Sequence, residues 1–164
     1  MTRGFTPAEY HRRIDGIAAR IRESGVDGAL VFDPFNVFYL GLYYHPGKRP
    51  VILYVHHDGT LVALTPAMEA HEARKVEHFA AVDAYEDNYA AGSDLYDALG
   101  SMLRKAFGPL QTVAVDQMGL ATYRRLTTLF PTVVEEDLVA PSRVIKSDEE
   151  IAMLKLSAHY SDHV

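Results

Sequence analysis

The chain contains no cysteine and no tryptophan in its 164 residues. The lack of cysteine excludes disulfides, thiolate metal ligands and cysteine nucleophiles. No stretch approaches the roughly eighteen consecutive apolar residues of a membrane-spanning helix, and residues 1–13 have no apolar core of the signal-peptide type. These absences favour a cytoplasmic protein that does not bind a membrane.

Basic charge is also scarce. Sixteen Lys and Arg residues stand against 22 Asp and Glu, which gives a formal net charge of −6, and there is no basic block interleaved with aromatic residues. Nucleic acid is therefore a poor partner for this chain. Hydrophobic residues make up 48% of the sequence, which is enough to bury the core of one domain of this length. We expect no second complete domain.

The first quarter of the chain predicts a helix followed by a strand. Thr6 to Glu9 form a capping box with Pro7 at the first helical position, and Gly25 is a helix-ending residue. Apolar residues follow at helical spacing between them: Ile14, Ile17, Ala18 and Ile21. Residues 29–32 are a short apolar run that predicts a buried strand, and Asp33-Pro34 after it predicts a turn.

The middle of the chain predicts a β-hairpin. Residues 51–56 and 60–64 are rich in β-branched and aromatic side chains, and Asp58-Gly59 between them is a strong hairpin turn signal. The sheet must then be at least partly antiparallel.

Helices and strands alternate in the remainder. The patterns predict a helix over 66–76, a strand over 79–85, a loop over 88–92, a helix over 93–106, a strand over 112–115, a helix over 120–130 and a strand over 132–134. Inward-facing positions are expected at Leu95, Leu99, Met102, Leu103, Ala106, Tyr123, Leu126 and Leu129. The fold class is therefore α/β, with a mixed, partly antiparallel sheet of about six strands flanked by helices.

One more helix begins near the C-terminus. Ser147 is a good N-cap, Glu150 stands three residues later to complete a capping box, and the acidic first turn suits the helix dipole. Ile151, Leu154 and Ala158 continue an apolar stripe, but no later residues are present to pack on it. Either this helix folds back on the preceding domain, or its natural partner has been cut away.

A search for catalytic and metal sites finds no convincing set. There is no nucleophile elbow, dinucleotide fingerprint or phosphate-binding loop. His71-Glu72 begins like a zinc-binding helix, but Lys75 stands where the second histidine belongs. His56 and His57 are adjacent, so in a strand they would point to opposite faces and could not share an ion. The acidic residues Asp83, Glu86 and Asp87 are best explained as a solvated run. We expect no catalytic residue and no metal ligand in this chain.

The loop from Tyr43 to Pro50 is the one segment that gathers binding chemistry. It brings together Tyr44, His45, Lys48 and Arg49. Arginine offers a planar fork to a carboxylate, and tyrosines can wall a ligand. The alternative is an exposed basic turn with tyrosines packed beneath it.

The order of these pieces resembles the N-terminal domain of the creatinase, prolidase and Xaa-Pro aminopeptidase family, the "pita-bread" metallopeptidases. The likeness spans nearly the whole chain and rests on Arg13, residues 25–34, 36–41 and 64–69, and above all residues 143–151. The family usually has Asn-x-x-Tyr-Leu-Thr-Gly-Phe, whereas here Leu40 is followed directly by Gly41-Leu42, one residue short.

The resemblance implies two parts within the chain. Residues 1–142 would form the creatinase/prolidase N-terminal-like domain, and residues 143–164 the linker and the start of the first helix of a C-terminal catalytic domain. That further domain would carry two divalent metal ions (Mn, Co or Zn) on Asp, Asp, His, Glu and Glu ligands, none of which lies in this chain. By itself the chain is then expected to be inactive and to hold no cofactor.

The resemblance also implies a function. In the family, the N-terminal domain makes dimer contacts and leans over an active site, and Tyr44, His45 and Arg49 stand where substrate-binding residues are expected. We predict a non-catalytic domain of a Xaa-Pro dipeptidase- or aminopeptidase-like metallohydrolase, which serves dimerisation and substrate gating for a short proline-containing peptide. Two alternatives stay open: the N-terminal domain of a creatinase-like amidinohydrolase, and a free-standing α/β module that binds a small anion.

Overall fold

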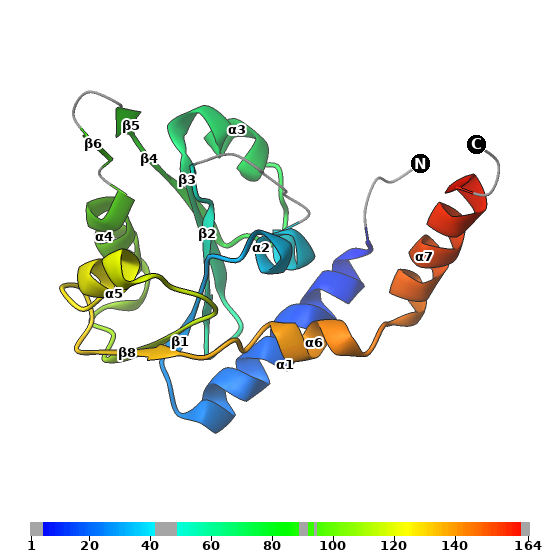
Figure 1. Ribbon diagram of the computed structural model, residues 1–164, viewed down its shortest axis with the longest axis horizontal. Coiled ribbons are helices and arrows are strands. Elements are labelled where there is room, and N and C mark those ends of the chain that lie inside the picture. Colours follow the sequence, from blue (N-terminus) through cyan, green and yellow to red (C-terminus); the bar gives the residue numbers. More distant parts are fainter. Residues whose placement is uncertain (1–4, 42–48, 89–91, 94, 162–164) are drawn as a thin grey trace.

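The computed structural model describes residues 5–41, 49–88, 92–93 and 95–161 (Figure 1). Its helices are α1 (Pro7–Ser24), α2 (Pro34–Gly41), the 3-10 turn η1 (Ala67–Glu69), α3 (Ala70–Ala73), α4 (Leu95–Phe107), α5 (Leu120–Leu126), α6 (Ala140–Val144) and α7 (Asp148–Ser161). Its strands are β1 (Gly28–Val31), β2 (Ile52–His56), β3 (Leu61–Pro66), β4 (Ala81–Tyr85), β5 (Asp87–Asn88), β6 (Gly92–Ser93), β7 (Thr112–Val115) and β8 (Thr132–Glu135). None of the helices in the described ranges has the length and apolar character needed to cross a bilayer.

The main sheet has six strands in the order β4-β3-β2-β1-β7-β8. Strand β1 pairs antiparallel with β2 on one side and parallel with β7 on the other. The predicted hairpin is confirmed, because β2 and β3 pair antiparallel from Ile52 opposite Leu64, and Gly59 in the turn has a φ of 91°. The predicted fold class, a mixed and partly antiparallel sheet flanked by helices, is also confirmed.

Helices cover both faces of this sheet (Figure 1). Helices α1, α2 and α6 lie on one face, and α4 and α5 lie on the other. Because side chains alternate along a strand, Ala29 and Val31 of β1 join the first core, whereas Leu30 between them joins the second. The domain is thus a three-layer sandwich with two separate apolar cores.

Helix ends follow the predicted capping chemistry. The Thr6 hydroxyl accepts a hydrogen bond from the Glu9 amide at 3.3 Å, and Gly25 ends α1 in the left-handed region with a φ of 69°. At α7 the capping box is reciprocal: the Glu150 amide donates to the Ser147 hydroxyl at 3.2 Å, and the Ser147 amide donates to the Glu150 carboxylate at 2.8 Å. The predicted capping box of α7 is confirmed, whereas at α1 only the Thr6 N-cap is: the Thr6 amide donates to Glu149, and the Glu9 carboxylate accepts from Arg12 and Arg13 instead.

Helix α2 is an element that the sequence patterns do not predict. Asp33-Pro34 indicates a turn, but in the structure it begins a helix: the Asp33 carboxylate accepts from the amides of Phe35 (2.8 Å) and Asn36 (3.1 Å), and Pro34 takes the first helical position. An Asp-Pro pair before an apolar run is therefore also a helix-start signal.

Other predicted boundaries are wrong in detail. The helix predicted over 66–76 is a 3-10 turn followed by the short α3, and the helix predicted over 120–130 ends at Leu126. Tyr123, predicted to face inward, is 42% exposed, and Ala106 is exposed as well. The loop predicted over 88–92 is flanked by a strand pair, because Asp87–Asn88 lies antiparallel to Gly92–Ser93.

Candidate functional site

The predicted substrate-binding residues are only partly within the described structure. Tyr44 and His45 lie outside the described residues. Arg49 precedes β2, is partly exposed, and donates from Nη1 to the Met68 sulfur at 2.9 Å. Met68 lies in η1 at the end of β3 and is itself 69% exposed. Arg49 therefore stands at the surface, at the edge of the sheet where β3 ends.

The residues on either side of the predicted binding loop are held by the fold. The carbonyl of Leu40, at the end of α2, accepts a hydrogen bond from His78 Nε2 at 2.6 Å. The carbonyl of Pro50 accepts one from the hydroxyl of Tyr85, a buried residue at the end of β4, at 2.9 Å. The chain thus leaves α2 and enters β2 at fixed points.

The surroundings of His78 lower its pKa. Its ring stacks on Tyr10 of α1, with centroids 4.1 Å apart and an interplanar angle of 15°. Burial lowers the pKa of His78 most strongly, the hydrogen bond to the Leu40 carbonyl opposes this, and the nearby Arg13 guanidinium lowers the pKa further. The imidazole joins α1 to the end of α2.

No group of three or more His, Asp or Glu side chains suited to a metal ion occurs within the described residues. The prediction for His56 and His57 is wrong in its geometry: β2 ends at His56, so His57 lies in the turn and the two ring centroids are only 3.9 Å apart. Each imidazole ring nevertheless has its own polar contact. His56 Nδ1 lies 3.0 Å from the Asp58 carboxylate, and His57 Nδ1 lies 3.1 Å from the Asp27 carbonyl.

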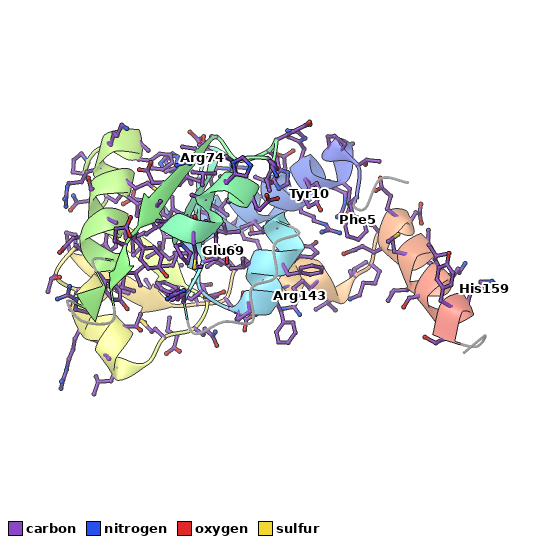
Figure 2. All side chains as sticks on the ribbon, turned by 90° about the horizontal axis from the view of Figure 1, so that it is seen from above. Phe5, Tyr10, Glu69, Arg74, Arg143 and His159 are labelled. Atoms are coloured by element: carbon purple, nitrogen blue, oxygen red, sulfur yellow. The ribbon has the colours of Figure 1, made fainter. Side chains whose placement is uncertain are left out.

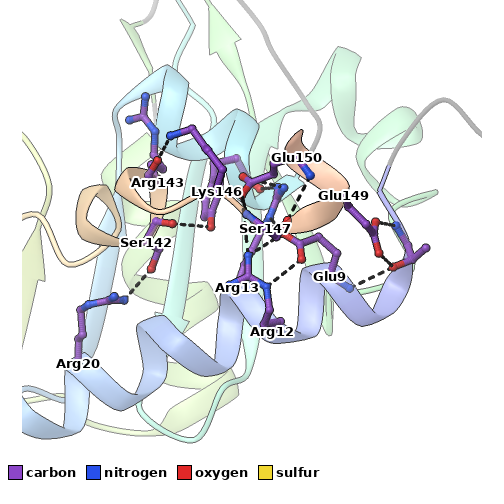
Figure 3. A network of polar contacts seen from close by, with 12 residues as sticks. Glu9, Arg12, Arg13, Arg20, Ser142, Arg143, Lys146, Ser147, Glu149 and Glu150 are labelled. Carbon is purple, nitrogen blue, oxygen red and sulfur yellow. Dashed lines mark hydrogen bonds and ion pairs between the residues drawn. The ribbon is translucent and has the colours of Figure 1, made fainter. Parts of the chain in front are cut away.

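A buried ionic network joins α1 to the first turn of α7 (Figure 3). Arg13 is 2% exposed. It donates to Glu9 at 2.8 Å, to Glu150 at 3.1 Å and to the Tyr39 carbonyl at 2.6 Å. Its guanidinium also lies 4.1 Å over the ring of Phe5 and 4.2 Å over that of Tyr39. One side chain from the core of α1 therefore contacts both α2 and α7.

Two further contacts complete this network, which we call the α1–α7 junction (Glu9, Arg12, Arg13, Glu149 and Glu150, with Thr6). Arg12 makes a bidentate pair with Glu9 at 2.7 and 2.8 Å. The Glu149 carboxylate accepts from the Thr6 amide at 3.0 Å and from its hydroxyl at 2.6 Å. The hydrogen bond from Arg12 is the main cause that lowers the pKa of Glu9, to about 2.

A second polar cluster fixes the segment before α7. The Asn36 amide nitrogen donates to Asp116 at 3.0 Å and to Asp137 at 3.1 Å, and its oxygen accepts from Arg143 at 2.9 Å. Asn36 is fully buried, and burial raises the pKa of Asp116. The Asp137 carboxylate also accepts from the amides at the start of α6, Val139 (2.9 Å) and Ala140 (2.8 Å). The path from β8 through α6 is therefore tied to α2.

Sequence reasoning identifies Arg13 only through the family resemblance, and it assigns Glu9 to a capping box, whereas the Glu9 carboxylate pairs with Arg12 and Arg13. One signal was available. Arg13 falls on the apolar face of α1, next to Ile14 and one turn before Ile17, and Glu9 stands four residues before it. A charged residue on a buried stripe requires a buried partner of opposite charge.

Comparison with known proteins agrees with this architecture. Residues 13–147 match the family model described as the Creatinase/Prolidase N-terminal domain. The chain belongs to this family. Its fold is shared by the creatinase/prolidase N-terminal domain of an X-Pro dipeptidase from Streptococcus pyogenes, with a TM-score of 0.64 at 23% identity over 76% of this chain and 98% of that chain.

Longer relatives are similar over only part of their length. The Bacillus subtilis (strain 168) protein named "Putative dipeptidase YkvY" is 26% identical over 92% of this chain and 42% of its own length. The Xaa-Pro dipeptidase from Bacillus anthracis has a TM-score of 0.73 at 16% identity, over 89% of this chain and 39% of that chain. The present chain thus spans less than half the length of these relatives and corresponds to the N-terminal domain of Xaa-Pro dipeptidase-like proteins.

Proposed function

We propose that this chain is the non-catalytic N-terminal domain of a Xaa-Pro dipeptidase-like metallohydrolase, and that it contributes a gate over an active site carried by a second domain. The observation that carries the proposal is the exposure of the apolar side chains of α7. This helix stands away from the sandwich (Figures 1 and 2), and its apolar side chains are open to solvent, with Leu154 57% and Tyr160 59% exposed. A helix with exposed apolar side chains needs further protein to cover it.

The α1–α7 junction supports the same proposal, because it sets the direction in which the following domain would begin. Arg13 and Glu150 form a buried ion pair at 3.1 Å, which restrains the first turn of α7. The Asn36 and Asp137 cluster fixes α6 just before it. A gating residue such as Arg49 would then stand in a defined position relative to a domain built on α7.

The proposed chemistry is divided between the two domains. Two divalent metal ions bound by the second domain would supply an activated water for hydrolysis of the bond before proline. In this chain, the Arg49 guanidinium would bind the carboxylate end of a short peptide, with His45 and Tyr44 beside it. The full-length protein would be a homodimer in which this domain makes part of the contact.

The test compares Arg49→Ala with the wild type in the full-length gene product, assayed on Xaa-Pro dipeptides with Mn²⁺. Loss of a charge-assisted hydrogen bond to substrate should lower kcat/KM by about tenfold or more, mainly through KM, and should leave the melting temperature nearly unchanged. Arg124→Ala, an exposed arginine on α5 at the other face of the sheet, is the matched control and should behave as wild type.

Equal kinetics for Arg49→Ala and wild type would remove Arg49 from the site. The purified chain of 164 residues should show no turnover of Xaa-Pro dipeptides or creatine with Mn²⁺ or Co²⁺. Metal-dependent turnover that a point substitution in this chain abolishes would overturn the proposal. Turnover of creatine by the full-length product would place it among amidinohydrolases, and sedimentation of that product tests the dimer.

A further inference from the structure

A crevice opens at the edge of the sheet where β1 and β7 end. These strands are parallel neighbours, but the chain leaves them in opposite directions: β1 leads to α2 on one face of the sheet, and β7 leads to α5 on the other. Ligands of open α/β sheets bind at such a switch point, outside the carboxyl ends of the strands. A cavity of about 530 Å³ lies there.

The strand ends that border this crevice are held together by hydrogen bonds. Asp116, the residue after β7, accepts hydrogen bonds from the amides of Phe32 (2.8 Å) and Asp33 (3.0 Å), which follow β1. The two strand ends are thereby fixed to one another. A ligand would meet a preformed surface and would not have to order it, which reduces the entropic cost of binding.

The lining combines an apolar wall with a small number of polar groups. Phe32, Pro50, Leu95 and Met118 supply the apolar part. Gln117, Tyr96, Thr122 and Glu135 supply an amide, two hydroxyls and a carboxylate. The Tyr96 hydroxyl donates to the Thr122 hydroxyl at 3.3 Å, so the Thr122 proton can be donated to a ligand. This composition is typical of small-molecule sites.

The lining carries a negative charge, which favours a cationic ligand. Glu135 at the end of β8 contributes a carboxylate, and the lining residues within the described ranges include no Lys, Arg or His. The Arg125 guanidinium lies 5.3 Å over the ring of Tyr96 and is not part of the lining. A carboxylate beside neutral donors binds a cation that also carries a hydrogen-bond acceptor.

We propose that this crevice binds a small α-ammonium carbonyl compound, the class that includes amino acid amides and the amino terminus of a peptide. Glu135 accepts hydrogen bonds from the ammonium group, Gln117 and Thr122 donate to the carbonyl oxygen, and an aliphatic side chain packs on Phe32, Leu95 and Met118. Arg49 is not among the lining residues, although its neighbour Pro50 is. The test needs neither Arg49 nor a second domain, so its outcome is independent of the function proposed above.

Three compounds that differ by one group each can test the proposal on the purified chain by NMR titration. L-leucinamide has the ammonium, carbonyl and aliphatic groups, N-acetyl-L-leucinamide lacks the ammonium, and 3-methylbutylamine lacks the carbonyl. We expect saturable shifts at Gln117, Thr122 and Glu135 with L-leucinamide, and dissociation constants about tenfold higher with either analogue. Equal binding of the acetylated compound, or shifts spread over other surfaces, would overturn the proposal.

Variants make the assignment specific. Glu135→Gln should raise the dissociation constant of L-leucinamide to that of its acetylated analogue, and Thr122→Val should reduce the advantage of L-leucinamide over 3-methylbutylamine, since Gln117 remains as a donor to the carbonyl oxygen. Glu136→Gln is the matched control, because Glu136 directly follows β8 and its carboxylate accepts from the hydroxyl of Ser24 in α1 at 3.2 Å, on the other face of the sheet. An equal loss of binding in the Glu136 variant, or none in the Glu135 variant, would refute the site.

Discussion

Helices α4 and α7 have nearly the same length, 13 and 14 residues, but they are attached to the domain by different forces. Helix α4 buries one apolar face, formed by Leu95, Leu99, Met102 and Leu103, against the sheet. Helix α7 buries only Glu150, and its remaining side chains from Ile151 onward are exposed. Apolar packing holds α4 along its length, whereas polar contacts hold α7 at one end.

The apolar residues of α7 are also distributed differently. With about 100° per residue, Ile151, Leu154 and Ala158 form one stripe, and Met153, Leu156 and Tyr160 form another on the roughly opposite face. A helix on the outside of a domain needs one apolar face, as α4 has. Two opposite stripes are typical of a helix covered from two sides, and the difference between α4 and α7 is therefore a difference in the number of neighbours that each requires.

The largest expected effect comes from breaking the polar attachment of α7. Arg13→Leu leaves the buried Glu9 and Glu150 carboxylates without their shared cation, which should lower the free energy of unfolding by about 3–5 kcal/mol in urea denaturation. Arg12→Leu removes the same charge one residue earlier, from a side chain that is 50% exposed, and should cost less, about 1–2 kcal/mol, because Arg13 still pairs with Glu9 and Glu150. Equal losses would show that burial of Arg13 is not what makes the junction strong.

Next in size is the apolar attachment of α4, measured against that of α7. Leu99 is 0% exposed, so Leu99→Ala should destabilise the chain by about 2–5 kcal/mol. Leu154→Ala makes the same chemical change at a side chain 57% exposed, and should change stability by less than about 0.5 kcal/mol. A large loss at Leu154 would mean that α7 packs on something in the isolated chain, and the contrast between the two helices would fail.

The smallest expected effect is the loss of stability at acid pH. The pKa of Glu9 is lowered to about 2 in the folded chain, below the ordinary value of 4.5, mainly because Arg12 donates to it. Its contribution to stability is therefore fully present above about pH 4.5 and is lost as the pH falls towards 2, by on the order of 2–3 kcal/mol. Glu9→Gln should lack this part of the pH dependence in urea titrations between pH 5 and 3. Parallel curves for the two proteins would refute the assignment.

Local signals predict the starts of α1 and α7 because an N-cap acts on an amide three positions later, as Thr6 with Glu9 and Ser147 with Glu150 show. The hairpin is predicted for the same reason. The strand order is not predictable in this way, because the position of β1 between β2 and β7 depends on pairing across more than 80 residues, from Gly28 to Val113. Non-local pairing leaves no periodic trace in the sequence.

The surroundings of the candidate site are less predictable than the fold. Arg49 is proposed from its chemistry, whereas the contacts that fix the chain beside it, from His78 to the Leu40 carbonyl and from Tyr85 to the Pro50 carbonyl, join residues distant in sequence through backbone atoms. A backbone carbonyl has no residue identity, so no motif reveals such a contact. The crevice beside β1 and β7 cannot be predicted from the sequence either, because the strand order creates it.

Glu150 has two tasks that use different oxygens: one accepts from the Ser147 amide and the other from Arg13. The residue that caps the start of α7 therefore also fixes this helix to α1. Inserting one residue between Ser147 and Glu150 would move Glu150 by about 100° around the helix, so that its carboxylate could no longer reach the Ser147 amide and Arg13 together. The three-residue spacing within the first turn therefore determines which side of α7 faces α1.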